Sequence, residues 1–515
     1  MSRRNKFLLI AVFPAALLLL LIARPVIHLG RAALSGKNQI EQLPPGFADD
    51  ISRMNRTRVA QIWDIPAEPQ EGEKQLRQLL HRAHDLGLHV SIAGARHSMG
   101  GQTIAPGGIE INMLPFRGMV LDEKNNILHV QAGAKWADVI PFLDRHGRSV
   151  WVMQSDNAFT VGGSLSVNCH GWQYGRPPIA STVESFHLMK ADGTVVRCSR
   201  TENKELFSLA LGGYGLFGII LDADLHVVPN TRLHLEQYLV PAAHGFEAFD
   251  RRLREKQDLQ MAYGRLNITP SHMFDEAVIN MFYPEPGPVP PLGDQGSRSI
   301  ARAVFRGSVG SAFGKELRWS AETKLLPHLS GSVFSRNQLL NDIPDWYLDH
   351  SAATTDILHE YFVPRENASR FLSAARKTIR NNNGDLLNVT VRDVQTDDDS
   401  FLRYARRPLV AFVMFFSQPR SLAGDAQMQQ MTQELIDDAL ETGGTYYLPY
   451  RLHATPEQFR RAYPQADDFF AAKRRYDPGE LFQNQFYLKY GVQTRLTFAA
   501  GNPQFFPLTT PPYQI

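Results

Sequence analysis

Three glycine-rich segments hold the residues of this 515-residue sequence that are best suited to binding a charged ligand. They are residues 94–102, which contain His97; residues 160–171, which contain His170; and residues 211–218. Glycine lets the backbone approach a ligand closely, and successive N–H groups can converge on a pyrophosphate. None of the three is a Walker loop or a G-x-G-x-x-G turn opening a helix. One such loop is often only a turn, but three together indicate a binding site outside the usual NAD and ATP motifs.

Alternating strands and helices must position these loops. Apolar residues at helical spacing predict helices over 76–86 and 136–145, which end at Gly87 and Gly147. The Asp192-Gly193 step predicts a hairpin between residues 185–190 and 194–198. Further apolar runs predict strands at 88–93, 109–113, 127–132 and 218–228. This order predicts an α+β fold with a ligand-binding lobe that ends near residue 230.

The pattern of apolar runs after residue 230 predicts a second lobe built on a sheet. Residues 386–391 and 409–416 are expected to form strands, residues 427–440 a helix, and residues 283–298 a loop rich in proline and glycine. Residues 455–490 are expected to be mainly helical. The expected organisation is an N-terminal membrane anchor (1–24), a linker (25–55), the binding domain (56–230), a substrate or cap domain (231–450) and a C-terminal segment that returns to the binding lobe (451–515).

Composition narrows the class of protein. The 43% apolar and 21% charged residues fit a folded chain, and the length is too great for one ordinary core. The net charge is only +2, from 54 basic and 52 acidic side chains, so nucleic acid is not an expected partner. The two cysteines, Cys169 and Cys198, allow at most one disulfide. His81, His84 and His89 are not expected to bind metal, because a helix stop separates the third from the others.

Several motifs resemble a known family. Residues 97–108 (HSMGGQTIAPGG) resemble the flavin-linking segment of cytokinin dehydrogenases, and residues 160–166 and 205–220 continue that likeness. Residues 360–364, 387–392, 475–478 and 482–484 resemble segments of decaprenylphosphoryl-ribose oxidases and of aldonolactone or alditol oxidases. Over roughly residues 55–490 the chain therefore resembles FAD-linked oxidases of the vanillyl-alcohol-oxidase type, whose FAD-binding domain is called PCMH-type.

The resemblance implies a flavoprotein of two lobes with the flavin at their interface. His97 matches the position that several relatives bond to the flavin 8α-methyl; a neutral imidazole can add to an electrophilic flavin. The alternative is that His97 only hydrogen-bonds the cofactor. The residues expected to line FAD are Gly94, Arg96, His97, Ser98, Gly101, Gln102, Thr160, Gly162, Gly163, Ser166, His170, Ile220 and Asn484.

Because the flavin takes hydride at N5, the protein must position the donor and remove a proton from its oxygen or nitrogen. The candidates are Asp156, for which a role as a turn residue is equally open; Arg392, which matches a strand arginine of the lactone oxidases; and Tyr450, for which a packing role is equally open. Glu360 is expected to be structural, because its neighbours form an apolar run. Thr390 stands where alditol oxidases have a glutamate, which weakens the case for polyol substrates.

The function expected first is oxidation of a CH–OH group in a sugar, sugar lactone or lipid-linked sugar, with O₂ or a quinone as electron acceptor. Oxidation of a CH–NH group, as in cytokinin dehydrogenases, is the second hypothesis. A non-catalytic flavin-binding protein is the third, because two residues that act in relatives are replaced here.

The N-terminus contains an uncharged apolar stretch, residues 7–23, preceded by Arg3, Arg4 and Lys6. This pattern predicts a single membrane-spanning anchor with the catalytic body on the non-cytoplasmic side. A cleaved signal peptide and a twin-arginine export signal are the alternatives.

Overall fold

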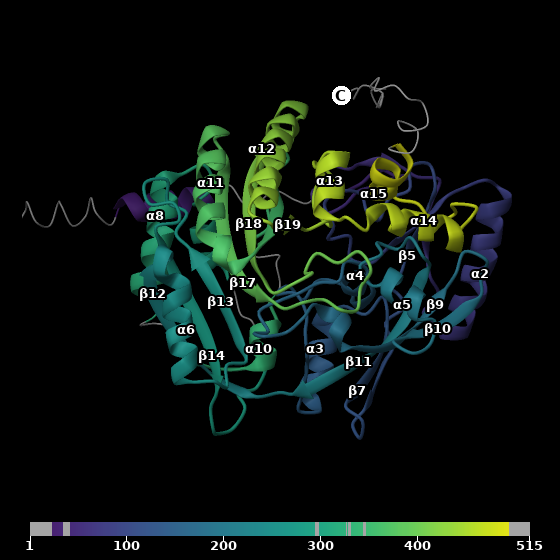
Figure 1. The fold of residues 1–515 in the computed structure, drawn as a ribbon, viewed down its shortest axis with the longest axis horizontal. Helices are drawn as coiled ribbons and strands as arrows, with labels where there is room; N and C mark the ends of the chain where they lie inside the picture. The colour runs from purple at the N-terminus through teal and green to yellow at the C-terminus, as the bar shows by residue number, and fades with distance from the viewer. Residues whose placement is uncertain are drawn as a thin grey trace, which may run out of the picture.

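The structure is a computed structural model that describes residues 23–33, 42–293, 298–325, 327, 331–342 and 347–493. Figure 1 shows two lobes side by side. The first lobe contains the strands up to β11 (Ile219–Pro229) and the C-terminal helices, and the second lobe contains the strands from β12 (Arg232–Pro241) to β19 (Thr445–Tyr446).

The first lobe carries two larger sheets and a two-stranded ribbon. A three-stranded parallel sheet has the order β3 (Gln61–Asp64), β5 (Ile109–Asn112), β4 (Val90–Ala93). An antiparallel sheet has the order β10-β9-β11-β7-β6, and β8 also pairs with β11. Its other strands are β6 (Met119–Asp122), β7 (Ile127–Gln131), β8 (Arg148–Val150), β9 (Val183–Met189) and β10 (Val195–Ser199), and the ribbon joins β1 (Phe47–Ala48) to β2 (Thr57–Arg58).

Local sequence signals explain the helices of this lobe. The Glu68 side chain accepts hydrogen bonds from two backbone N–H groups of the first turn of α2 (Pro69–Asp85), and Gly87 leaves the helix at a φ of 62°. Leu76, Leu80 and Ala83 of α2 are buried, so the predicted apolar stripe faces the core. The other helices are α3 (Trp136–Arg145), α4 (Val161–Ser166) and α5 (Lys204–Ala210).

The second lobe is built on an eight-stranded antiparallel sheet with the order β15-β12-β14-β13-β17-β18-β16-β19. Its remaining strands are β13 (Met261–Leu266), β14 (Glu276–Pro284), β15 (Val333–Ser335), β16 (Thr354–Val363), β17 (Asp385–Val394) and β18 (Leu409–Pro419). The helices are α6 (Gly245–Glu255), α7 (Ser299–Arg306), α8 (Ala312–Ser320), α10 (Arg336–Leu340), α11 (Ala368–Asn381) and α12 (Leu422–Glu441).

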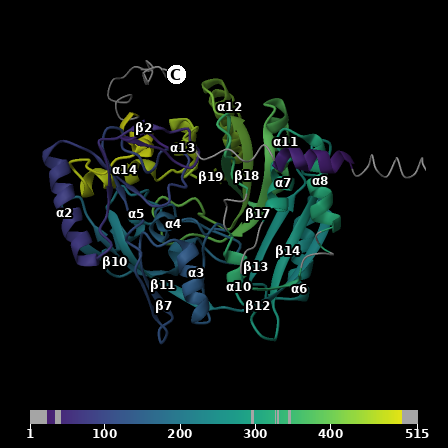
Figure 2. The ribbon, with the colours of Figure 1, turned by 180° about the vertical axis from the view of Figure 1, so that it is seen from behind.

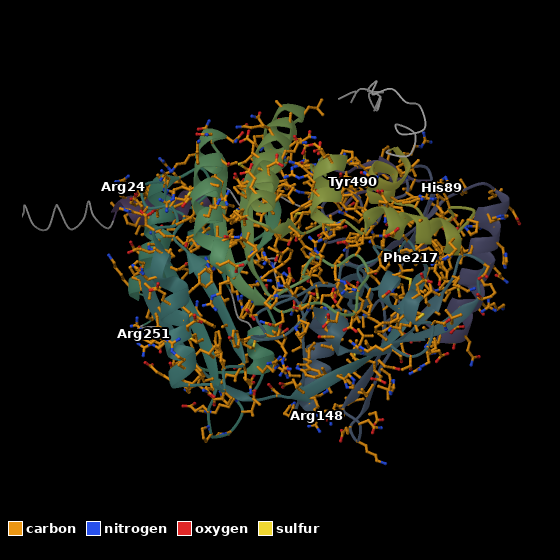
Figure 3. The ribbon with its side chains drawn as sticks, in the orientation of Figure 1. Arg24, His89, Arg148, Phe217, Arg251 and Tyr490 are labelled. Atoms are coloured by element: carbon orange, nitrogen blue, oxygen red, sulfur yellow. The ribbon has the colours of Figure 1, made fainter. Side chains whose placement is uncertain are left out.

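The C-terminal segment packs on the first lobe, where Figures 1 and 2 both show α14 (Ala466–Tyr476) beside α2. Val90 of β4 exchanges backbone hydrogen bonds with this segment, donating to Leu481 and accepting from Gln483. In Figure 3 the labelled His89 and Tyr490 lie in this part of the first lobe. The other helices of the segment are α13 (Pro456–Ala462) and α15 (Gln485–Tyr487).

The prediction of an irregular linker over residues 25–55 is wrong in part, because residues 23–33 form a helix. This helix packs on the second lobe: Nε2 of His28 lies 2.7 Å from the carbonyl oxygen of Gly307, and the Arg24 guanidinium lies 4.0 Å above the ring of Phe313. Figure 3 shows Arg24 at the outer edge of that lobe. These contacts with distant residues, which the sequence does not reveal, hold the segment in place.

The predicted membrane anchor, residues 1–24, lies outside the described residues except for its last two, Ala23 and Arg24, which begin the helix over residues 23–33. Among the helices of the described ranges, none has the length and apolar character needed to cross a bilayer. Cys169 and Cys198 are both buried free thiols, so the disulfide that the sequence allows is not formed.

Candidate functional site

A cavity with about 1190 Å³ of space, its open mouth included, receives residues from all three glycine loops and from the sheet of the second lobe. The structure brings most of the predicted site residues to its wall: Gly94, Arg96, His97, Ser98, Gln102, Thr160, Gly162, Gly163, Ser166, His170, Ile220, Arg392 and Tyr450.

The loop that follows β4 presents a row of unused backbone donors. Within the described chain, the N–H groups of Ala95, Arg96, His97 and Ser98 donate no hydrogen bond. Arg96 has a φ of 56°, in the left-handed region, which turns the backbone here. Its guanidinium is held by the buried carboxylate of Glu110, with Nε 2.8 Å from Oε1. Converging free N–H groups at such a turn form an anion-binding nest.

The first and second glycine loops touch each other at a point where no side chain fits. A Cβ atom on Gly94 would lie 2.1 Å from Oγ1 of Thr160. That Oγ1 accepts a hydrogen bond from the N–H of Gly163 and caps α4. A Cβ on Gly162 would lie 2.7 Å from the Cβ of Ala132. The glycines of these loops are therefore required for the close packing of the cavity wall.

His97 lies at the cavity wall against Phe159, with ring centroids 4.4 Å apart. Burial and then the positive charge of Lys135 lower the pKa of His97 to about 4. The imidazole is therefore neutral at physiological pH. Neither of its ring nitrogens has a hydrogen-bond partner in the described part of the chain, so a lone pair is available for bonding.

Two hydroxyl groups of the same loop are buried without partners. Oγ of Ser98 and Oγ1 of Thr103 make no hydrogen bond within the described structure, and both residues line the cavity. Gln102 is different, because its side-chain amide donates to the carbonyl oxygens of Leu448 and Tyr450, at 2.8 and 3.1 Å. Ser98 and Thr103 are thus suited to a polar ligand, whereas Gln102 holds the loop against residues 448–450.

The opposite wall of the cavity is one face of the second-lobe sheet. Glu360 of β16 and Thr390 of β17 are both registered with Val413 of β18, so all three side chains lie on the same face. Arg392, two residues after Thr390, also lies on that face. Thr390 stands where alditol oxidases have a glutamate. In this protein the carboxylate on the face comes instead from Glu360, two strands away from Thr390 in the sheet. The opposite face is covered by α6, α11 and α12, as Figures 1 and 2 show for α11 and α12.

Glu360 joins two other residues of the cavity wall. Its Oε1 lies 2.5 Å from Nε2 of His170, and its Oε2 accepts a hydrogen bond of 3.1 Å from the hydroxyl of Tyr450. Burial raises the pKa of Glu360, but His170, Arg392 and Tyr450 together outweigh burial and hold this pKa below its ordinary value. Burial raises the pKa of Tyr450 well above its ordinary value. At neutral pH the pair is therefore a carboxylate and a neutral phenol.

Arg392 completes this group. One of its guanidinium nitrogens, Nη2, donates to Oγ of Ser155 at 2.8 Å, while Nε is buried without a partner within the described residues.

Cys169 also lines the cavity, but burial raises the pKa of its thiol to about 12. The thiol is therefore protonated and a poor nucleophile. In the described residues no group of histidine, cysteine and carboxylate side chains is arranged to hold a metal ion.

Three predicted site residues are not at the cavity wall. Gly101 lies behind the loop, where its N–H donates to Asp50 and its φ of 69° serves the turn. The side-chain amide of Asn484 donates to the carbonyl of Tyr214, and its carbonyl caps α15. The carboxylate of Asp156 accepts a hydrogen bond from the N–H of Ala158, as expected of a turn residue.

Glu360 is a charged residue of the cavity wall that was not among the predicted site residues. It was expected to be structural because its neighbours are apolar, but its carboxylate reaches the cavity. The available signal was the charge itself: a carboxylate in an apolar strand must find partners, and such groups concentrate at functional sites. Thr103, inside the motif of residues 97–108, and Tyr447, which no motif distinguishes, also line the cavity.

Comparison with known proteins agrees with this geometry. Residues 69–199 match the family model described as an FAD binding domain. The chain is 31% identical to L-gulonolactone oxidase of Mus musculus over 160 residues, which are 31% of this chain and 36% of that protein. It is 36% identical to cytokinin dehydrogenase 2 of Arabidopsis thaliana over 139 residues, 27% of this chain and 28% of that protein. The chain thus aligns with about a third of the length of these relatives.

The residues present fit FAD. The free N–H groups after β4 suit its pyrophosphate, and the unpartnered hydroxyls of Ser98 and Thr103 suit its polar groups. The close contact of Gly94 with Thr160 leaves backbone, not side chains, at this part of the wall. The matched domain contains these residues, so the expectation of FAD as the cofactor is confirmed.

Proposed function

We propose, from the premise that residues 69–199 are an FAD-binding domain, that the protein is an oxidoreductase that removes hydride from a CH–OH group of a sugar, sugar lactone or lipid-linked sugar. When bound, FAD accepts the hydride and passes the electrons to O₂ or a quinone. The observation that carries the proposal is the placement of Arg392, Glu360 and Tyr450 on the wall opposite the N–H row.

The free donor group of Arg392 favours an oxygen at the reacting carbon. The unpartnered Nε–H of Arg392 can donate to a donor oxygen as negative charge develops on it. Relatives named L-gulonolactone oxidase and cytokinin dehydrogenase are similarly close, so CH–NH oxidation is the second candidate.

His97 is proposed to form a covalent bond to the flavin. Its neutral imidazole has two unpartnered nitrogens within the described structure, which is the state required of a nucleophile. A non-covalent contact is the alternative.

The apolar stretch at residues 7–23 is proposed to anchor the protein in a membrane with both lobes on the non-cytoplasmic side. Such an anchor would suit a lipid-linked donor or a quinone.

The test is anaerobic reduction of the purified flavoprotein by a panel of aldonolactones, alditols, polyprenyl-phosphate sugars and isoprenoid adenines. Bleaching of the flavin by a lactone, alditol or lipid-linked sugar supports the proposal. Bleaching by adenines alone assigns the CH–NH reaction. A flavin that only dithionite reduces, and that neither O₂ nor a quinone reoxidises, indicates a binding protein without catalysis.

A further inference from the structure

We propose that Tyr450, Glu360 and His170 form a proton relay in which Tyr450 takes the proton of the donor hydroxyl and passes its own to Glu360, while His170 positions the carboxylate. The relay rests on the proposed function, because it requires a CH–OH donor. The relay identifies the base that removes the proton of the donor hydroxyl, a group that the three glycine loops do not supply.

The geometry gives each member one task. Tyr450 lines the cavity and its hydroxyl already donates to Oε2 of Glu360, so its oxygen lone pairs are free to accept another proton. Glu360 is buried, with each of its two oxygens engaged by one partner. The donor hydroxyl can therefore pass its proton to Glu360 only through the phenol of Tyr450.

His170 has one fixed tautomer in this arrangement. Its Nε2 lies 2.5 Å from the carboxylate, and its Nδ1 is buried without a partner in the described chain. A proton on Nδ1 would be a buried donor without an acceptor, which destabilises that tautomer. The proton therefore sits on Nε2 and is donated to Glu360, which orients the carboxylate and keeps it ionised.

The protonation step balances as follows. The donor O–H bond breaks as its proton bonds to the Tyr450 oxygen, the phenolic O–H breaks, and a new O–H forms on Oε2 of Glu360. The donor carbon loses hydride to FAD, the oxidant, and becomes a carbonyl carbon. The products are the carbonyl compound, reduced FAD and a neutral Glu360, which returns its proton to solvent through the same phenol before the next turnover.

The experiment measures flavin reduction under anaerobic conditions in Glu360→Gln and Tyr450→Phe, with the donor that reduces the wild type. Glutamine keeps the shape and one acceptor, and phenylalanine keeps the ring, so FAD content and the visible spectrum should be unchanged. Each variant should reduce flavin about 100-fold more slowly at saturating donor, with KM little changed. The double variant should lose no more than the slower single variant, because the residues act in series.

The pH profile separates a relay from a packing role. The titratable groups that face Glu360 are His170, Arg392, Tyr450, Tyr404, Tyr447 and Tyr463. In the wild type the reduction rate should fall at acid pH as Glu360 becomes protonated, and Glu360→Gln should lack this limb. The control is Glu366→Gln, which alters an exposed ion pair with Arg407 and should leave rate and profile unchanged.

A second readout needs no substrate. Nitrogen-15 NMR of histidine-labelled protein should show His170, identified by loss of its signal in His170→Asn, with hydrogen on Nε2 and none on Nδ1. The Nε2–H proton should move upfield in Glu360→Gln. A His170 with hydrogen on Nδ1 overturns the positioning role. Wild-type reduction by an alcohol together with unchanged rates in Glu360→Gln overturns the relay and leaves the proposed function intact, whereas no alcohol reducing the wild type overturns both.

Discussion

At the scale of single residues, the state of His97 decides whether a covalent flavin can form. The pKa of about 4 lies below the ordinary 6.5, so the imidazole is neutral throughout the physiological range. A protonated imidazole has no available lone pair to add to the flavin, whereas the imine-like nitrogen of a neutral imidazole has one. The surroundings of His97 thus supply the reactive form without a separate base.

His97→Ala should retain FAD but lose its covalent attachment. Wild-type protein precipitated with acid should keep flavin fluorescence on the polypeptide, and the variant should release it. The control is His84→Ala, which changes an exposed histidine of α2. Acid-stable flavin in His97→Ala would refute this residue as the point of attachment.

The direction of the pH effect follows from the same pKa. Because the folded-state pKa is lowered, the unfolded chain binds this proton more readily, so His97 costs stability as pH falls from about 6.5 to about 4. Attachment of flavin to refolded apoprotein should therefore proceed unchanged from pH 8 to pH 5 and stop only near pH 4.

At the scale of elements, the contact between the first two glycine loops controls the cavity wall. Gly94 follows β4 directly, and Thr160 caps α4, so a shift at either loop moves both. No side chain fits at Gly94, because the first added atom would overlap Oγ1 of Thr160.

Gly94→Ala should therefore lose most of its FAD and show a melting temperature several degrees lower, since overpacking typically costs about 1–3 kcal/mol. The matched control is Gly245→Ala at the start of α6, where the added methyl group meets open space and the backbone is helical. Normal FAD content in Gly94→Ala, measured from the visible spectrum, would contradict the packing argument.

Helix α12 ties the second lobe to the loop that carries His97. Its Asp425 accepts two hydrogen bonds from Arg451, which also donates to Asn55, and Asn55 donates to the carbonyl of Met99. Burial raises the pKa of Asp425, but His453 and Arg451 outweigh it and lower this pKa to about 2. The ion pair is therefore present at neutral pH.

Asp425→Asn should lower the melting temperature at pH 7 by a few degrees, because the pKa shift corresponds to roughly 2 kcal/mol. The folded-state pKa is depressed, so this stabilisation is present above pH 4 and is lost as pH falls from 4 towards 2. The difference between variant and wild type should accordingly shrink at pH 3. Asp437→Asn, in an exposed pair on the same helix, should change little at either pH.

At the scale of the whole molecule, the site exists only where the lobes meet. The N–H row and His97 come from the first lobe, and Glu360 and Arg392 come from the second. The segment after β19 crosses back to the first lobe and carries Tyr450 on the way. A donor bound in the cavity is therefore enclosed by both lobes, and its chemistry depends on their contact.

Deletion of residues 1–22 should release the protein from membranes and leave flavin reduction within about 2-fold of the full-length rate. The reason is that the described lobes and the helix over residues 23–33 remain intact. The measurement is the share of protein that sediments with membranes after a carbonate wash, beside the mass of the mature N-terminus. Full-length protein that does not sediment and begins after the apolar stretch would show a cleaved signal peptide instead.

The sequence by itself determined the elements and the cofactor wall. The helix over residues 136–145 and the hairpin between β9 and β10 have the predicted positions, because apolar periodicity and turn residues are local properties. The glycine loops were also recognisable, since a close backbone approach requires glycine itself. His97 can also be identified from the sequence, because it lies in a contiguous motif.

Only the tertiary structure decided which side chains face the donor. Glu360 is 190 residues from His170 in sequence. Its side chain reaches the cavity because β16 pairs with β18, which in turn pairs with β17 in the same sheet. Gln102 and Asn484, which the resemblance places at the cofactor, both hydrogen-bond the backbones of other segments, and of the two Gln102 lines the cavity. Register and long-range contact arise from packing across the whole chain, so no local pattern records them.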